Sequence, residues 1–199
     1  MRISWRRCSA LIASDLWRHA GKAGSGTFCG RFIAVPGFRY AALLRLYAYA
    51  RSAPLCQVGI RQLLVLLLRH YSIRFGIDIS RDARIGSGFY IGHFGGIVVN
   101  AGVVIGNNCN LSQGVTIGQQ NRGDRAGCPV VGNNVYIAPG AKIIGRVQIG
   151  DDVAIGANAV VVHDVAPHTT VGGVPARVIS QNGSEGYVNR TDYPAVPPA

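Results

Sequence analysis

Aliphatic residues recur every six positions over the second half of this chain. A helix repeats its buried face every 3.6 residues and a strand every two, so neither requires a step of six. A solenoid with a triangular coil does require it, because each side takes one hexapeptide and stacks its inward side chain on the coil below. Glycine follows many of these residues, where the backbone turns a corner. The pattern predicts a parallel β-helix with these inward positions: Ile79, Ile85, Ile91, Ile97, Val99, Ile105, Leu111, Ile117, Val131, Ile137, Ile143, Ile149, Ile155 and Val161.

The step of six breaks twice. Only two positions separate Ile97 from Val99, just after His93, and fourteen separate Ile117 from Val131. A rigid repeat accommodates an insertion only where the chain can leave the coil. The longer break therefore predicts a projecting loop, and loops of this kind commonly carry function.

The residues that precede the solenoid have the pattern of helices. Ser14 and Asp15 are candidates to cap a short helix, and good helix formers predict two longer ones over residues 38–52 and 55–71.

Three parts of the chain follow from these patterns. Residues 1–75 form a basic helical cap, residues 76–180 the β-helix, and residues 181–199 a polar, proline-containing tail that we expect to be mobile. A chain of 199 residues suffices for one such solenoid and its cap. The predicted fold class is mainly β: a parallel β-helix of hexapeptide repeats with an N-terminal α-helical cap and a flexible C-terminal tail.

Residues 77–179 resemble the left-handed hexapeptide-repeat acyltransferases, and most closely the serine O-acetyltransferases and their relatives in polysaccharide biosynthesis. The resemblance implies a left-handed coil, a homotrimer and acetyl-CoA bound between neighbouring coils. It rests on Gly76-Ile77-Asp78-Ile79, on Ile91-Gly92-His93-Phe94-Gly95-Gly96-Ile97-Val98-Val99, and on Pro167-His168-Thr169-Thr170 with Gly173-Val174-Pro175-Ala176-Arg177.

A histidine at the first break is the candidate catalytic base. Transfer of an acetyl group from a thioester to a hydroxyl needs a base, and neutral histidine has a suitable pKa. His93 lies between Gly92 and the pair Gly95-Gly96, which leaves its ring accessible. Asp78 precedes it by fifteen residues, nearly one coil, so its carboxylate can orient the imidazole from an adjacent rung. The same spacing belongs to the catalytic dyad of the serine O-acetyltransferases. A histidine that only fills the irregular coil is the less favoured interpretation.

The resemblance also supplies candidate acetyl-CoA contacts along the groove between coils. Gly118, Ala138 and Ala157 are equally suited to a structural role at the corners of the coil. The prediction that they bind acetyl-CoA therefore rests on their common register along successive coils. The predicted cofactor-binding residues are Gly118, Gln119, Ala138, Pro139, Ala157, Thr170 and Arg177, with Lys142 as a further candidate near the CoA phosphates. No metal is expected.

The chain departs from the serine O-acetyltransferases where those enzymes hold the amino acid. They have an aspartate where this chain has Gly92, a histidine where it has Cys128, and an Arg-Asp-Pro-Ala segment that residues 21–26 do not match. A serine ammonium needs carboxylates, whereas a sugar hydroxyl suits a neutral pocket. We therefore predict Gly92, Arg125 and Cys128 as substrate-binding residues. The expected acceptor is a sugar of an exopolysaccharide or lipopolysaccharide precursor, and L-serine is the alternative.

The net charge of +11 belongs entirely to the cap, because twelve basic residues and only Asp15 precede residue 75. Aromatic side chains interleave with these arginines, a mixture that favours peripheral contact with anionic lipid at about 1 kcal/mol per basic residue. An ordinary solvated basic face is the plainer interpretation. Nothing resembles a module that reads nucleic acid.

Five scattered cysteines without a CxxC pair indicate free thiols in a reducing cytoplasm. The apolar run over residues 63–68 is far shorter than the roughly 20 residues of a membrane span. We expect a cytoplasmic enzyme, with peripheral contact at the inner membrane face. Two other classes stay open: a zinc enzyme, which needs about three converging histidines, and a non-catalytic scaffold that docks at membranes.

Overall fold

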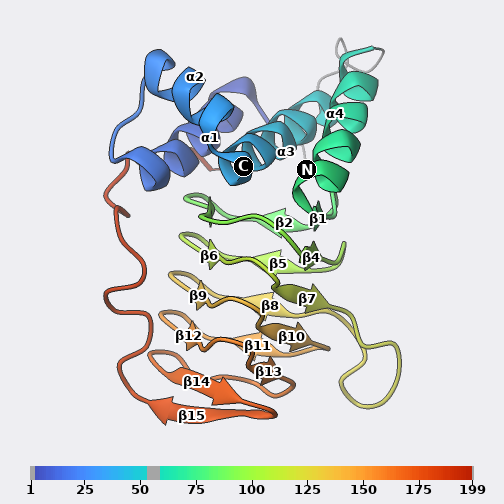
Figure 1. The fold of residues 1–199 in the computed structure, drawn as a ribbon, viewed down its shortest axis with the longest axis vertical. Helices are drawn as coiled ribbons and strands as arrows, with labels where there is room; N and C mark the ends of the chain where they lie inside the picture. The colour runs from blue at the N-terminus through green and yellow to red at the C-terminus, as the bar shows by residue number, and fades with distance from the viewer. Residues whose placement is uncertain (1–2, 53–58, 199) are drawn as a thin grey trace.

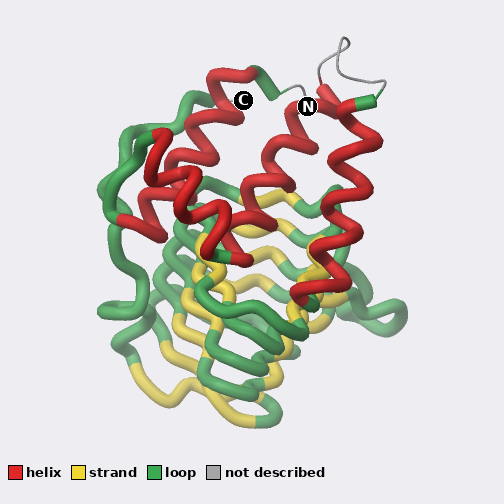
Figure 2. The backbone as a smooth tube through the Cα atoms, turned by 45° about the horizontal axis from the view of Figure 1, so that its top comes forward, coloured by secondary structure: helices red, strands yellow, loops and turns green. Residues whose placement is uncertain are grey.

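The computed structural model describes residues 3–52 and 59–198. Helices cover one end of a triangular solenoid (Figures 1 and 2). The helices are α1 (Trp5–Ala20), α2 (Ser25–Ala34), α3 (Pro36–Ser52) and α4 (Ile60–Phe75). The strands are β1 (Ile77–Ile79), β2 (Arg84–Ile85), β3 (Tyr90–Ile91), β4 (Ile97–Val99), β5 (Val104–Ile105), β6 (Asn110–Leu111), β7 (Thr116–Gly118), β8 (Val130–Val131), β9 (Tyr136–Ile137), β10 (Lys142–Ile144), β11 (Gln148–Ile149), β12 (Ala154–Ile155), β13 (Val160–Val161), β14 (Thr170–Gly173) and β15 (Ala176–Ser180).

The strands stack into three sheets, one for each side of the coil. Their orders are β1-β4-β7-β10-β13, β2-β5-β8-β11 and β3-β6-β9-β12-β14-β15, and all pairs are parallel except the last, β14 with β15. Val99 pairs with Ile117, 18 residues away, whereas Ile77 pairs with Ile97, 20 residues away. The two additional residues belong to the turn that carries His93. The predicted parallel β-helix with a helical cap is confirmed.

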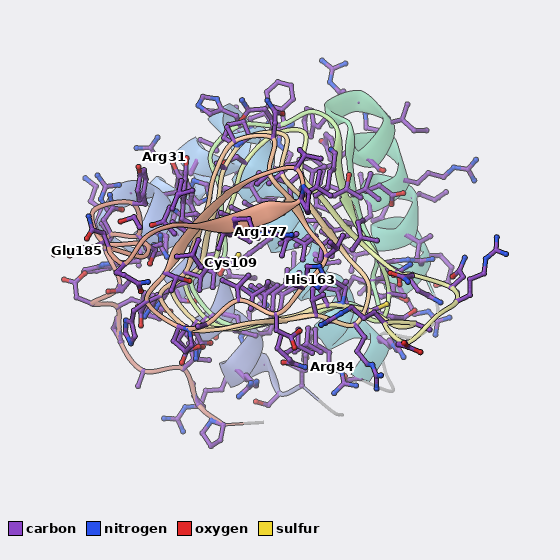
Figure 3. The ribbon with its side chains drawn as sticks, turned by 90° about the horizontal axis from the view of Figure 1, so that it is seen from below. Arg31, Arg84, Cys109, His163, Arg177 and Glu185 are labelled. Carbon is purple, nitrogen blue, oxygen red and sulfur yellow. The ribbon has the colours of Figure 1, made fainter. Side chains whose placement is uncertain are left out.

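The ladder of aliphatic residues fills the inside of the solenoid. Every predicted inward position is buried except Ile85, which is half-buried beneath the cap. Cys109 is also enclosed by the coil, which Figure 3 shows along its axis. Full burial of one such side chain contributes about 1.5–3 kcal/mol, so the stacked ladder supplies the main stabilisation of the fold.

One corner of the solenoid is a column of glycines that the ladder does not reveal. Gly76, Gly96, Gly114 and Gly140 follow one another on successive coils with φ between 61° and 76°. A Cβ atom on Gly96 would lie 3.3 Å from the Gly114 Cα, and one on Gly114 would lie 3.3 Å from the Gly140 Cα. Both the left-handed backbone and the close stacking therefore favour glycine here.

The first helix is longer than the sequence suggests. It begins after Ser4, whose hydroxyl accepts a hydrogen bond from the Arg7 amide at 3.2 Å, and it ends at Gly21, where φ is 68°. The prediction that Ser14 or Asp15 caps a helix is therefore wrong. Both residues lie within α1, where they are buried against the first coil and serve tertiary contacts.

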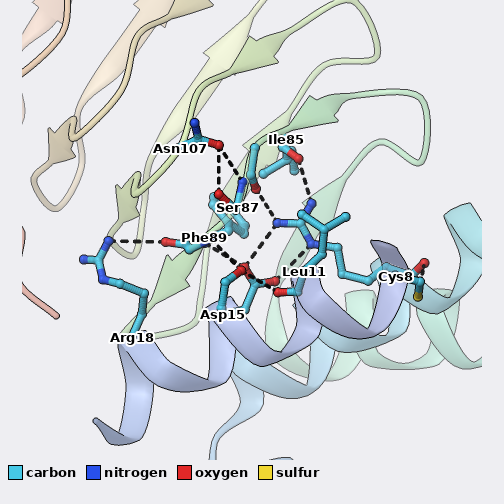
Figure 4. A network of polar contacts seen from close by, with 12 residues as sticks. Cys8, Leu11, Asp15, Arg18, Ile85, Ser87, Phe89 and Asn107 are labelled. Carbon is cyan, nitrogen blue, oxygen red and sulfur yellow. Dashed lines mark hydrogen bonds and ion pairs between the residues drawn. The ribbon is translucent and has the colours of Figure 1, made fainter. Parts of the chain in front are cut away.

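A buried ion pair joins the cap to the solenoid (Figure 4). The Asp15 carboxylate accepts hydrogen bonds from Arg45 Nε at 3.0 Å, from Arg45 Nη2 at 3.2 Å and from the Phe89 amide at 2.8 Å. Arg45 also donates to the carbonyl oxygens of Ile85 at 2.7 Å and Gly86 at 2.5 Å. Part of the basic charge of the cap is thus structural.

The two longer predicted helices correspond to α3 and α4. The second begins at Ile60, and residues 55–58 of its predicted range lie outside the described residues. Within the described parts, no helix has both the length and the apolar character needed to cross a membrane. One face of α4 nevertheless exposes large apolar side chains, namely Ile60, Leu63, Leu66 and Ile73.

We expected residues 181–199 to be mobile. In the structure, residues 181–198 instead lie along the outside of the solenoid and return to the cap (Figure 1). Ser184 is buried and donates to the Asn134 carbonyl oxygen at 2.6 Å, while the Tyr187 ring stacks on Tyr136 at 4.5 Å. The polar composition thus serves hydrogen bonds to the corners of the coils. Further hydrogen bonds to the cap and first coils join Trp17 to Asp192, Arg7 to Pro197 and Tyr193 to Asn108.

Candidate functional site

His93 lies in the turn between β3 and β4, with its side chain exposed to solvent. Gly95 and Gly96 bend this turn at φ of 109° and 65°. The ring of Phe94 rests on Phe75 at the end of α4, with 5.6 Å between centroids. The last turn of α4 therefore fixes the turn and leaves the imidazole accessible.

Asp78 lies in the centre of β1, between two buried isoleucines, and its side chain points outward. It pairs with Val98 of β4. A groove of about 730 Å³ runs beside it, between α4 and the strands β1, β4 and β7. The polar side chains that line this groove are Tyr40, Arg69, Ser72, Asp78, Ser80, Arg81 and Asn100.

The structure places the two residues of the predicted dyad on neighbouring rungs. Asp78 is in β1, and His93 is in the turn that leads into β4, the strand that pairs with β1. Among the described residues, no hydrogen bond or ion pair joins the His93 ring to the Asp78 carboxylate. Their catalytic roles stay a prediction.

Three of the predicted acetyl-CoA contacts share an edge of the solenoid with His93. Backbone hydrogen bonds link the turns along this edge: Gly114 to Gly95, Gly140 to Gln113 and Asn158 to Pro139. Ala138 and Pro139 lie in the third of these turns and Ala157 in the fourth. Ala138 is buried, whereas Ala157 is exposed. Lys142 donates to the Gly114 carbonyl oxygen on the same edge.

The remaining predicted contacts lie elsewhere. Gly118 is the last residue of β7, on the opposite border of the sheet β1-β4-β7-β10-β13 from the His93 turn, and it lines the groove. Gln119 is the first residue of the projecting loop. Thr170 and Arg177 belong to the antiparallel pair of the last coil, β14 and β15. Within a single chain, the seven predicted acetyl-CoA contacts therefore do not lie in one cleft.

The predicted projecting loop is present and folds back onto later coils. Arg125 donates to Asp164 at 3.1 Å, and the Gln148 amide together with Arg125 lowers the pKa of this carboxyl. Cys128 instead approaches the groove, because its Sγ donates to Asn100 Oδ1 at 3.3 Å. Of the two predicted substrate contacts in the loop, only Cys128 is next to the groove.

The third predicted substrate contact, Gly92, is crowded by a neighbour. A Cβ atom on Gly92 would lie 3.0 Å from Tyr90 Cε1. The ring of Tyr90 in turn packs on His19, with 4.4 Å between centroids. An aspartate at this position would therefore require Tyr90 to move.

Sequence reasoning missed most of the polar groove residues, among them Tyr40 and Arg81. The Tyr40 hydroxyl accepts from the Ile79 amide at 3.3 Å and thereby supports β1 beside Asp78. Arg81 follows the same strand and stacks over the Tyr47 ring at 5.1 Å. The position of Arg81 just after an inward isoleucine at a corner was a usable signal, whereas that of Tyr40 in α3 was not.

Within residues 3–52 and 59–198, no three His, Cys, Asp or Glu side chains group closely enough to hold a metal ion.

The chain is similar in sequence to hexapeptide-repeat transferases and to serine acetyltransferases. The family described as bacterial transferase hexapeptide (six repeats) matches residues 128–163. The serine acetyltransferase of Synechococcus elongatus is 41% identical over 118 residues, which are 59% of this chain and 48% of that protein. The chain thus spans about half the length of the curated relatives it matches.

Solved structures extend the similarity to the helices. A serine acetyltransferase from Brucella abortus in complex with coenzyme A is 30% identical, with a TM-score of 0.73 over 88% of this chain and 68% of that one. The Neisseria gonorrhoeae enzyme in complex with serine is 31% identical, with a TM-score of 0.71 over 89% of this chain and 71% of that one. Together with the hexapeptide ladder, this similarity shows that the chain belongs to the hexapeptide-repeat acyltransferases, close to their serine acetyltransferases.

Proposed function

We propose that this chain is an acetyl-CoA-dependent O-acetyltransferase. His93 takes the proton of an acceptor hydroxyl as the hydroxyl oxygen attacks the acetyl carbonyl carbon. The carbon–sulfur bond then breaks, and the protonated His93 returns the proton to the sulfur, so that coenzyme A leaves as the thiol. Asp78 orients the imidazole of His93 and stabilises its protonated form. The observation that carries the proposal is the position of an exposed histidine and an outward aspartate on paired rungs, in a fold whose relatives include one solved with coenzyme A.

The comparisons favour L-serine as the acceptor, which was the alternative expectation from the sequence. Relatives at 39–41% identity are serine acetyltransferases, and one solved structure contains serine. None of these names mentions a glycan. L-Serine is therefore the first acceptor to test.

One observation still supports a neutral or anionic acceptor as a second candidate. Asp78 is the only acidic side chain that lines the described groove, whereas Arg69 and Arg81 are both basic. An ammonium group gains little in such surroundings, because the neighbouring cations oppose it. Gly92 adds no carboxylate beside His93. A sugar hydroxyl, with or without an anionic substituent, fits this charge pattern.

Release of free thiol from acetyl-CoA tests both acceptors in one assay, with L-serine in one arm and sugars and sugar phosphates in the other. A His93→Ala variant should lose at least about 10²-fold in turnover, which is the usual contribution of a general base. His163→Ala is the matched control, because His163 is also exposed but lies on a distant coil. Equal activity of both variants would contradict the assignment of His93.

We also propose that the active form is a homotrimer. The exposed apolar face of α4 continues at Phe94 and Val98, beside His93 and the groove. Exposed apolar patches of this kind mark association surfaces. Sedimentation equilibrium at several protein concentrations tests the stoichiometry, and a monomer at assay concentrations would contradict it.

Peripheral contact of the basic cap with anionic lipid in the cytoplasm stays a prediction. Co-sedimentation with vesicles that contain phosphatidylglycerol tests it.

A further inference from the structure

A second pocket lies outside the candidate active site, where α1 and α3 meet the turn before β2. Its volume is about 380 Å³. Arginines dominate its polar lining, namely Arg7, Arg45, Arg51, Arg81 and Arg84, while Ile3, Leu11, Leu44 and Ile85 form apolar walls. The only acidic residue among the lining side chains of this described pocket is Asp82.

The charges of this pocket do not cancel. Arg45 is neutralised by the buried carboxylate of Asp15, and Arg51 pairs with Asp82 at the rim. Among the described residues, Arg81 and Arg84 have no carboxylate within ion-pair distance. Arg84 is exposed on the outside of the coil (Figure 3). Two guanidinium groups therefore stand unpaired over a partly apolar concavity.

A third guanidinium completes the rim of the pocket. Arg7 donates to the Pro197 carbonyl oxygen, which anchors its side chain without removing its charge. Arg81 is likewise held in place, because its guanidinium stacks over the buried ring of Tyr47. Fixed guanidinium groups lose less conformational entropy on binding an anion than free ones do.

We propose that this pocket binds a phosphate or diphosphate group. Arginine forks match the oxygen atoms of phosphate and form charge-assisted hydrogen bonds that are about twice as strong as neutral ones. Apolar walls reduce solvent screening of these bonds. The volume accommodates a diphosphate, and the excess charge is opposite in sign to it. This assigns part of the basic charge of the cap to a defined site.

The position of the pocket suggests what carries the phosphate. Arg81 lines both this pocket and the groove that contains Asp78. A ligand whose phosphate contacts Arg81 can therefore extend toward Asp78 with a hydroxyl-bearing part. Such a ligand is a phosphorylated sugar or a lipid-linked glycan, which belongs to the second acceptor class proposed above, and this step rests on the proposed acetyl transfer. The anion site itself does not depend on that activity.

Calorimetric titration of the full chain with inorganic pyrophosphate in 0.15 M salt tests the site. The double variant Arg81→Gln/Arg84→Gln should weaken binding at least about tenfold, since it removes charge-assisted hydrogen bonds to the anion. The matched control is Lys22→Gln/Arg61→Gln, which removes the same charge from exposed cap positions outside the pocket. Tryptophan fluorescence checks that both variants are folded.

Vesicles that contain 30% phosphatidylglycerol distinguish the source of the phosphate. Loss of vesicle binding in the pocket variant but not in the control indicates a lipid headgroup, and loss of pyrophosphate binding alone indicates a soluble phosphate. An equal effect in the two variants, or no binding of either probe to the wild type, overturns the site.

The link to acetyl transfer is tested separately. The wild type should have a lower KM for a sugar phosphate than for the same neutral sugar, and the pocket variant should reduce that difference. Pyrophosphate binding without this preference would retain the anion site and overturn its role in acceptor binding. Absence of any acetyl transfer would instead overturn the proposed function.

Discussion

Removal of the Asp15 carboxylate should weaken the attachment of the helical cap to the solenoid. The Asp15→Ala variant loses two hydrogen bonds from Arg45 and one from the Phe89 amide. It also leaves the Arg45 guanidinium, whose side chain is only 8% exposed, without its counter-charge. Breaking a buried pair by removing one partner typically costs about 3–5 kcal/mol. We expect a loss of stability in this range, because Arg45 keeps only its two backbone carbonyl acceptors.

A second ion pair at the same junction provides the control. Arg51 and Asp82 also connect the cap to the first coil, but their side chains are 55% and 62% exposed. Exposed pairs contribute about 0–1 kcal/mol, so Asp82→Ala should have a small effect.

Urea unfolding followed by tryptophan fluorescence suits this comparison, because both tryptophans of the chain, Trp5 and Trp17, lie on α1. The double variant Asp15→Ala/Arg45→Met should recover part of the lost stability, since it removes the uncompensated charge. A loss below about 1 kcal/mol in Asp15→Ala, or equal losses in Asp15→Ala and Asp82→Ala, would refute the reasoning.

Three further predictions concern the cap, the glycine column and the C-terminal segment. Burial, with Arg31, Arg18 and Arg190 nearby, lowers the pKa of His19 to about 3; because this is below the ordinary value of 6.5, unfolding takes up a proton. The contribution of neutral His19 to the free energy of unfolding is complete above pH 6.5 and falls by about 1.4 kcal/mol per pH unit toward pH 3. A His19→Phe variant should therefore show a shallower pH dependence of this free energy in urea unfolding. Gly114→Ala should lower the free energy of unfolding by about 1–2 kcal/mol in the same assay, because φ is 72° and the Gly140 backbone is 3.3 Å from the new Cβ. The control Gly30→Ala, at a position in α2 with open space around it, should be neutral or stabilising. A larger loss in Gly30→Ala than in Gly114→Ala would contradict the role of the glycine column. Hydrogen exchange should be slow at the Ser184 amide, which donates to the Asp152 carbonyl oxygen at 2.9 Å, and exchange as fast as in an unstructured peptide would show that the segment is mobile.

The solenoid and the positions of its irregularities follow from the order of residues alone. A step of six is a local property, and each inward side chain meets an equivalent side chain one coil away, so the repeat specifies its own packing. The same reasoning identified the turn of His93, because two additional residues cannot fit inside a regular coil, and it identified the projecting loop. Glycine at the corners was expected as well, although the left-handed column from Gly76 to Gly140 needed the backbone angles.

The contacts that hold the non-repeating parts of the chain become visible only in the folded protein. Asp15 contacts Phe89 across 74 residues and Ser184 contacts Asn134 across 50, and no periodic pattern relates such positions. From the sequence alone, a polar residue in a helix or in a tail is expected to contact solvent. Asp15 and Ser184 are instead buried and hydrogen-bonded to the corners of the coils, which gives them a structural role. The two pockets that meet at Arg81 arise in the same way. Their walls combine helices from the cap with strands of the first coils, and only the folded chain brings these together.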